Sequence, residues 1–255
     1  LGTPVREVRR VDSGFRLQAG PVPDPSLLDA DGVVVAVPAS KAAPMLRQVV
    51  PWAAGELARI GYASLAIVTL VYPRTSLPQL SGLLVPGGRR EGTGTEAAAG
   101  VGGTAAGGFT VKALTFSSRK WAHLDDGRHT VLRASIGRYG EEQVLHHDDA
   151  ELVTAAVGDV AELTGLVAPP VASRVSRWGG ALPQYAVGHT DRVRRIQQDV
   201  AKVPGLAVCG AAYEGVGIPA CIRSGQAAAA AVLADLRGQG GRRAPHPACE
   251  NRRHE

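Results

Sequence analysis

The segment from Leu206 to Leu236 constrains the fold of this chain more than any other part of the sequence. It opens with the apolar run Leu206-Ala-Val-Cys209, continues through a loop at 210–217 that holds three glycines, and ends in a helical stretch that starts at Pro219. Proline suits the first turn of a helix, where its missing N–H group is not needed. Glycines let backbone approach a ligand closely, and a helix start offers free N–H groups. This strand, loop and helix predict an α/β unit that can hold a ligand at the loop.

A second unit of the same kind begins at Asp31-Gly-Val-Val-Val-Ala-Val-Pro38. A continuous apolar run that stops at proline is typical of a strand buried on both faces, because proline cannot donate to the next ladder bond. Residues 39–50 follow with apolar side chains at helical spacing. We therefore expect this strand to feed directly into a helix.

The rest of the chain alternates between short strands and two further helices. A helix should begin at Asp148 or Asp149, with Glu151 in its first turn, and end at Gly165. Its apolar face should consist of Leu152, Val153, Ala156, Val160 and Leu163. A polar helix is expected over 191–202. The expected strands are 4–11, 14–19, 61–72, 83–85, 110–116, 130–136 and 172–178.

Two segments are predicted to be disordered. Residues 87–108 contain nine glycines and no aliphatic side chain larger than valine, so they cannot bury enough surface to offset the entropy of ordering. The tail at 237–255 contains five arginines and two glutamates, so it contributes +3 to the formal net charge of +5. The body of the chain is therefore close to neutral, and this argues against nucleic-acid binding.

Composition and cysteine usage narrow the class of protein further. The chain has 255 residues, 45% of them hydrophobic, and no run of 18 apolar residues, so we expect a globular protein without a spanning helix. Its first residues lack the features of a signal peptide. Three widely spaced cysteines predict neither a disulfide framework nor a zinc site. A cytoplasmic location fits these features, and the absence of an initiating methionine suggests a partial chain.

Several motifs have simpler explanations than chemistry. Gly100-Val-Gly-Gly-Thr-Ala105 matches the glycine pattern of a dinucleotide-binding loop, but no predicted strand precedes it, so we do not interpret it as such a loop. His146-His-Asp-Asp149 contains residue types that bind metals. The side chains of adjacent histidines diverge, however, and the aspartates are better used to cap a helix, so we predict no metal site. Cys209 ends an apolar strand and is expected to be a buried hydrophobic residue.

Four blocks, in order, resemble the oxygen-dependent coproporphyrinogen III and protoporphyrinogen oxidases of the FAD amine-oxidase superfamily. The block Gly210-Ala-Ala-Tyr-Glu-Gly-Val-Gly-Ile-Pro219 is similar to the C-terminal flavin motif of these enzymes. The other blocks are Asp31–Pro38, Lys112–Trp121 and Leu182–His189. The resemblance covers residues 1–236 apart from the glycine-rich insert, and it identifies the chain as the C-terminal half of such an enzyme.

The resemblance implies roles for individual residues. Val5 matches the strand residue whose backbone meets the adenine end of FAD. The flavin contacts at the closing helix match Ala211, Val216, Gly217 and Ile218. Positions that line the porphyrinogen cavity match Leu84, Thr115 and Ile136, although each could equally belong to the core. Candidates for contacts with the substrate propionates are Lys112, Arg119, Lys120 and Arg138.

The implied fold is a mixed α/β flavoprotein of the amine-oxidase and p-hydroxybenzoate hydroxylase type. Residues 1–38 and 204–236 would form a split FAD domain, and 39–203 a substrate domain on a mixed sheet. The N-terminal βαβ unit of the family would lie outside this chain. A flavin that carries the chemistry itself needs no general base, so we name no catalytic residue.

The implied function is oxidation of a porphyrinogen to a porphyrin in heme biosynthesis, with O2 as acceptor and H2O2 as product. The bias towards Ala, Gly and Arg suggests a bacterium with a GC-rich genome, for which coproporphyrinogen III is the preferred substrate. Three alternatives stay open: an inactive fragment of such an enzyme, a protoporphyrinogen IX oxidase and another FAD amine oxidase. The resemblance also allows peripheral membrane contact and a homodimer of the full-length enzyme.

Overall fold

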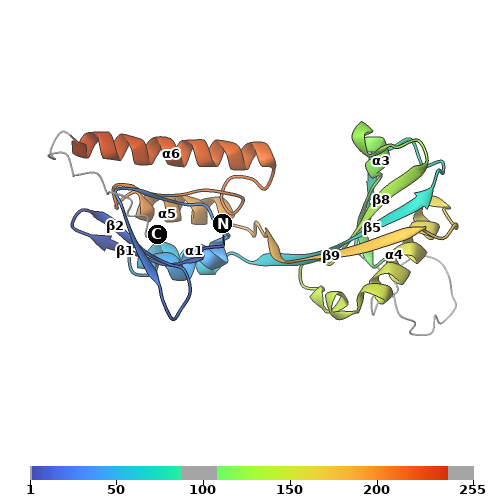
Figure 1. Ribbon diagram of the computed structural model, residues 1–255, viewed down its shortest axis with the longest axis horizontal. Helices are drawn as coiled ribbons and strands as arrows, with labels where there is room; N and C mark the ends of the chain where they lie inside the picture. Colours follow the sequence, from blue (N-terminus) through green and yellow to red (C-terminus); the bar gives the residue numbers. More distant parts are fainter. Residues whose placement is uncertain (1, 88–107, 241–255) are drawn as a thin grey trace, which may run out of the picture. The chain divides into compact units, whose positions relative to one another are not determined.

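A computed structural model describes residues 2–87 and 108–240, and it confirms the predicted α/β class (Figure 1). The chain divides into two compact units. The first unit comprises residues 1–61 and 183–255, and the second comprises residues 62–182. The first unit has two sheets and the second has one, each unit has its own helices, and each is described by itself.

The first unit contains a three-stranded antiparallel sheet in the order β1-β2-β3. The predicted hairpin is confirmed as β1 (Val5–Val11) and β2 (Gly14–Ala19), in which Val11 pairs with Gly14 across the turn. The third strand, β3 (Ser26–Ala30), was not predicted, because most of its side chains are exposed and it shows no apolar alternation. An ion pair with an N–O distance of 2.7 Å joins Arg16 and Asp29 across β2 and β3.

The two predicted α/β strands lie next to each other. The strands β4 (Val33–Val35) and β10 (Leu206–Val208) form a parallel pair, with Val33 opposite Leu206. Helix α6 (Ile218–Gly240) packs on this pair through Ala228, Val232 and Leu236, against Ala207 and Cys209. The expectation that β4 is buried on both faces is wrong at Val34, which points to the opposite face from the buried Val33 and Val35 and is 39% exposed.

The helix predicted over 39–50 ends early, at Leu46, and the helix that follows it was not predicted. Helix α1 (Ala39–Leu46) ends before α2 (Pro51–Ala58), which begins with a proline at its first position. Helix α5 (His189–Val200) packs against α2, and Asp199 accepts a hydrogen bond of 2.8 Å from the Ala53 amide at the start of α2. Within 2–87 and 108–240, no helix is both long and apolar enough to cross a bilayer.

The second unit is built on a five-stranded sheet in the order β6-β7-β8-β5-β9. Its long strands are β5 (Tyr62–Pro73), β8 (His129–Ile136) and β9 (Ala172–Pro183), and its short ones are β6 (Gly82–Leu84) and β7 (Val111–Thr115). The pairs β6–β7, β7–β8 and β5–β8 are antiparallel, where a mixed sheet was expected. Short helices connect the strands: α3 (Ser117–Lys120), η1 (Ala122–Leu124) and η2 (Glu142–His146).

Helix α4 (Asp149–Thr164) covers one face of this sheet (Figure 1). All five residues of its predicted apolar face pack into the core with the inward side chains of β5, β7 and β8. Of the two predicted starting residues, Asp148 caps the helix and forms a capping box with Glu151, and Gly165 ends the helix as predicted, in the left-handed conformation with φ of 74°. The sheet therefore has one face buried under α4 and one face that α4 leaves open.

The boundaries between the units differ from the predicted domain boundaries. Residues 39–61 and 183–203 were assigned to the substrate domain, but they pack with the first unit, because α1, α2 and α5 lie against one another and against β1 and β10. Residues 237–240 complete α6, although the tail was predicted to be disordered from 237. Disorder of 88–107 and 241–255 lies outside the described residues and stays a prediction.

Candidate functional site

The loop between β10 and α6 is held in a conformation that only glycine adopts readily. Gly210 and Gly215 have φ values of 120° and 138°, in a region that other residues rarely adopt. At Gly215 a Cβ atom would also lie 2.8 Å from the Cβ of Ala220. The amide of Gly210 donates a hydrogen bond of 3.1 Å to the hydroxyl of Ser224 in α6. The loop is therefore folded back against the helix that follows it.

Tyr185 ties the two ends of this loop together. Its hydroxyl donates a hydrogen bond of 2.6 Å to the Ala211 carbonyl and accepts one of 2.9 Å from the Gly215 amide. Burial raises the pKa of Tyr185, so the hydroxyl keeps the proton that it donates. The ring stacks on that of His189, with centroids 4.0 Å apart. Tyr185 belongs to the segment Leu182–His189, whose role in shaping the loop the sequence did not reveal.

Three of the four predicted flavin contacts of the loop lie together at the start of α6. Val216 and Ile218 are 50% and 77% exposed, and Gly217 lies between them. Ala211 stands at the other end of the loop, at the carbonyl that Tyr185 binds. Val5 lies on β1, opposite Ala19 in the antiparallel sheet of the same unit. The structure therefore brings Val216, Gly217 and Ile218 together, and it places Ala211 at the other end of the loop and Val5 in the three-stranded sheet.

The surface around the loop fits a flat, partly anionic ring. The exposed side chains of Val216 and Ile218 can contact the face of a ring. The first turn of α6 also presents backbone N–H groups that have no hydrogen-bond acceptor within the helix. Both ring nitrogens of the buried His189 lack a partner among the described residues. A helix start favours negative charge by about 0.3–2 kcal/mol, enough to tune a flavin but not to replace it. The residues present therefore fit a flavin at this place.

The three predicted pocket residues do not share one face of the second sheet. Leu84 pairs with Ala113, and Thr115 pairs with Arg133, so Leu84 and Thr115 point to the face opposite α4. Leu84 is 88% exposed. Ile136 has no exposed surface and packs in the core on the α4 side. The structure thus brings Leu84 and Thr115 to the open face and places Ile136 in the core.

The four predicted propionate contacts have other partners in the structure. Lys112 donates to the Gly137 carbonyl, and burial, with the nearby Arg138, lowers the pKa of this lysine. Arg119 donates to Gln79, and the Lys120 ammonium lies 4.9 Å from the centre of the Trp121 ring. Arg138 donates three hydrogen bonds of 3.1–3.2 Å to the carbonyls of Val85, Phe109 and Val111. Arg138 therefore joins the two chain segments that flank residues 88–107.

The open face of the sheet carries a groove of which the sequence interpretation named only one lining residue, Thr115. It has a volume of about 560 Å³, in the range of small-molecule sites. Its lining residues are Ile67, Thr69, Thr115, Trp121, Arg133, Ser135, Arg174, Ser176 and Trp178. The signal that could have found it is the alternation of apolar and polar residues in β8, which sets Arg133 and Ser135 opposite the core face.

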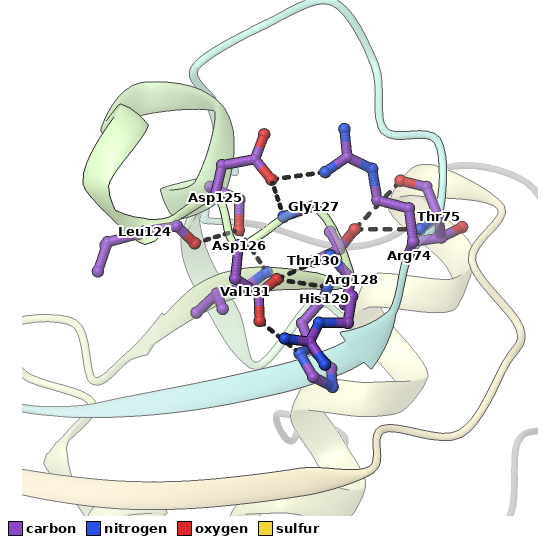
Figure 2. A network of polar contacts seen from close by, with 11 residues as sticks. Arg74, Thr75, Leu124, Asp125, Asp126, Gly127, Arg128, His129, Thr130 and Val131 are labelled. Atoms are coloured by element: carbon purple, nitrogen blue, oxygen red, sulfur yellow. Dashed lines mark hydrogen bonds and ion pairs between the residues drawn. The ribbon is translucent and has the colours of Figure 1, made fainter.

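A second hollow of about 630 Å³ lies at the other end of β5 and β8, beside a polar network (Figure 2). Arg74 pairs with Asp125 at 2.5 Å, and Asp126 lies 2.7 Å from the Nδ1 atom of His129. The hydrogen bond with His129 and those from backbone amides lower the pKa of Asp126. These polar groups bind one another and fix the turn that leads into β8, so the network supports the fold.

Two other predictions can be compared with the structure. The Nδ1 atom of His147 lies 3.1 Å from a carboxylate oxygen of Glu151, and Asp148 caps α4 as predicted. This segment therefore stabilises the start of the helix. No cluster of three or more His, Cys, Asp or Glu residues that could hold a metal ion occurs among residues 2–87 and 108–240. Cys209 is 5% exposed, which confirms it as a buried residue, and burial raises the pKa of its thiol.

Comparison with known proteins places this arrangement in a family. The family model described as flavin containing amine oxidoreductase matches residues 1–233. Coproporphyrinogen III oxidase from Mycobacterium leprae is 36% identical over 208 residues, which cover 81% of this chain and 41% of that protein. The corresponding protein from Bacillus subtilis is 32% identical over 210 residues, which cover 82% of this chain and 41% of that protein.

A solved structure agrees with this result. The crystal structure assigned to a protoporphyrinogen oxidase from Exiguobacterium sp. 255-15 has a TM-score of 0.70 and 30% identity, and the match covers 92% of this chain and 47% of that one. The fold and the loop at α6 define a two-unit α/β flavoprotein. The chain belongs to the flavin-containing amine oxidoreductase family, which confirms the predicted cofactor, FAD. It spans less than half the length of the relatives that it matches.

Proposed function

We propose that the full-length protein is a coproporphyrinogen III oxidase of heme biosynthesis that uses FAD, takes O2 as electron acceptor and releases H2O2. The observation that carries this proposal is the similarity to coproporphyrinogen III oxidases over four fifths of the chain. The groove on the open sheet face supports it, because Arg133 and Arg174 in its lining suit a substrate with carboxylates. Membership of the oxidoreductase family is consistent with this reaction.

The residues of this chain bind and orient, and none of them needs to transfer a proton. FAD, when bound, supplies the hydride acceptor and the centre that reacts with oxygen. Ala211, Val216, Gly217 and Ile218 would hold the ring at the start of α6, and Val5 would meet the adenine end. Apolar side chains at this place also keep water away from the ring. In the second unit, Leu84 and Thr115 would contact the porphyrinogen on the open sheet face.

The activity can be tested on the full-length gene product. We expect oxygen uptake, formation of H2O2 and appearance of coproporphyrin when coproporphyrinogen III is added. Faster uptake with protoporphyrinogen IX would move the assignment to a protoporphyrinogen oxidase. Uptake with monoamines and none with porphyrinogens would contradict a porphyrinogen oxidase altogether.

The alternative for this chain by itself is a fragment that neither holds FAD nor turns over substrate. It is favoured by the length, since the chain spans about two fifths of the curated relatives. The visible spectrum of the purified chain separates the two cases. Absorbance at about 450 nm that stays with the protein after addition of FAD and removal of the unbound FAD would show that this part holds the flavin. A cytoplasmic location, peripheral membrane contact and a homodimer are further proposals for the full-length protein.

Replacing Tyr185 with phenylalanine should loosen the flavin loop. The change removes the hydroxyl that joins the Ala211 carbonyl to the Gly215 amide. Since the side chain is 44% exposed and water can replace the lost bonds in part, we expect a cost of about 0.5–1.5 kcal/mol. In the full-length protein this corresponds to a rise of about 2- to 13-fold in the Kd for FAD, measured by quenching of flavin fluorescence.

The matched control for this change is Tyr139→Phe. Tyr139 is 59% exposed and belongs to the second unit, whereas the loop belongs to the first. Its replacement should leave the Kd for FAD unchanged. Equal affinities in wild type and Tyr185→Phe would show that the hydroxyl does not shape the flavin site.

A further inference from the structure

Two arginines on the open face of the second sheet lack a partner of opposite charge. Arg133 lies on β8 and Arg174 on β9, on either side of β5. Among the described residues, neither guanidinium makes an ion pair or a hydrogen bond, and the Arg133 guanidinium lies 5.8 Å from the centre of the Trp121 ring. By contrast, Arg74 and Arg177 in the same unit pair with aspartates.

The surroundings of these two arginines are those of a binding surface. Both line the groove of about 560 Å³, whose lining contains no Asp or Glu. Hydroxyl groups of Thr69, Thr115, Ser135 and Ser176 line the same groove, and Thr69 on β5 lies between the strands of the two arginines. Trp121 and Trp178 add two large aromatic rings to the same groove. The groove therefore combines uncompensated positive charge, hydrogen-bonding groups and flat apolar surface.

This combination selects a particular chemistry in a ligand. A guanidinium binds carboxylates with two parallel hydrogen bonds, and tryptophan rings favour flat apolar groups. The register of the sheet places Arg133 in one row with Thr69 and Thr115, so a ligand lying across the strands meets all three. A macrocycle with several carboxylate side chains has both features.

We propose that Arg133 and Arg174 bind propionates of the substrate and give the enzyme its preference for coproporphyrinogen, which has four carboxylates, over protoporphyrinogen, which has two. This inference rests on the proposed function and adds to it the residues that set specificity. The arginines act in binding, so their loss should raise KM and leave kcat largely unchanged. The loss of one charged hydrogen-bonding partner should raise KM for coproporphyrinogen by roughly tenfold or more.

The test uses the full-length gene product as wild type, Arg133→Gln, Arg174→Gln and the double variant. Oxygen uptake gives kcat and KM with each porphyrinogen, and titration with coproporphyrin III gives a Kd that does not depend on turnover. We expect the double variant to raise KM and Kd by about 30-fold or more for the coproporphyrin series and by clearly less for the protoporphyrin series. Melting curves check the fold, and Lys variants, which keep the charge, should show smaller effects.

The control for the loss of charge is Arg128→Gln. Arg128 is exposed and does not line the groove, so its replacement should change neither KM nor Kd. If wild type oxidises coproporphyrinogen and the double variant keeps the same KM and the same substrate ratio, the inference is overturned while the proposed function stands. If wild type oxidises neither porphyrinogen, the proposed function fails, and the titration then decides: binding lost only in the groove variants supports the carboxylate site, and equal binding overturns it.

Discussion

Leu132→Ala should lower the free energy of unfolding of the second unit by about 2–5 kcal/mol. Leu132 has no exposed surface and lies in the middle of β8, in the core that the sheet forms with α4. The change removes apolar contacts and leaves a cavity that the neighbouring strands cannot close. Urea denaturation of the chain, followed by circular dichroism, measures the loss.

The matched control is Leu84→Ala, the same substitution in the same sheet. Leu84 is 88% exposed on the open face, so the free energy of unfolding should change by less than about 0.5 kcal/mol. If Leu84 contacts the porphyrinogen, this variant of the full-length protein should instead show a higher KM. Equal destabilisation by the two substitutions would contradict the assignment of the two faces.

Glu56→Gln, in the first unit, should cause the second largest decrease in the free energy of unfolding. The carboxylate of Glu56 is nearly buried in α2 and lies 2.6 Å from Arg195, 3.6 Å from Arg192 and 3.5 Å from Arg59. Its loss leaves the Arg192 guanidinium partly buried without an anion. Because the other two arginines are partly exposed and screened, we expect a loss of about 1–3 kcal/mol at pH 7.

The effect of Glu56→Gln should depend on pH. The hydrogen bond from Arg195, followed by the charges of the neighbouring arginines, lowers the pKa of Glu56. A carboxylate with a lowered folded-state pKa contributes stability that is fully present above its unfolded pKa of about 4.3 and is lost as pH falls through the folded pKa. Urea denaturation at pH 7, 5, 4 and 3 should therefore show the difference between wild type and Glu56→Gln shrinking below about pH 4.5.

The exposed pair of Arg16 and Asp29 offers a comparison for this network. Asp29→Asn removes a charge from an ion pair whose side chains are 45% and 58% exposed, so it should lower the free energy of unfolding by clearly less than Glu56→Gln does. An equal cost for Asp29→Asn and Glu56→Gln would show that the buried position of Glu56 adds nothing. A constant effect of Glu56→Gln from pH 7 to 3 would contradict the ionic origin.

Local patterns in the sequence determined much of the fold. The order of strand, glycine loop and helix at the C-terminal end, the apolar face of α4 and its capping residues all follow from spacing and side-chain chemistry within a few residues, and the structure confirms them. The sequence blocks also led to the right family, because glycines with unusual φ values and the residues around them are tightly constrained.

Other features could be found only in the tertiary structure. The strand β3 and the helix α2 were not predicted, because β3 depends on its pairing with β2 and α2 on its packing against α1 and α5. Ile136 and Thr115 looked alike as pocket candidates, but the sheet turns one to the core and the other to the open face. The groove of Arg133 and Arg174 arises because β8 and β9 lie on either side of β5, although they are far apart along the chain. Sequence determined what each segment can form, whereas strand register and pairing decided which side chains meet, because those contacts join residues far apart in the chain.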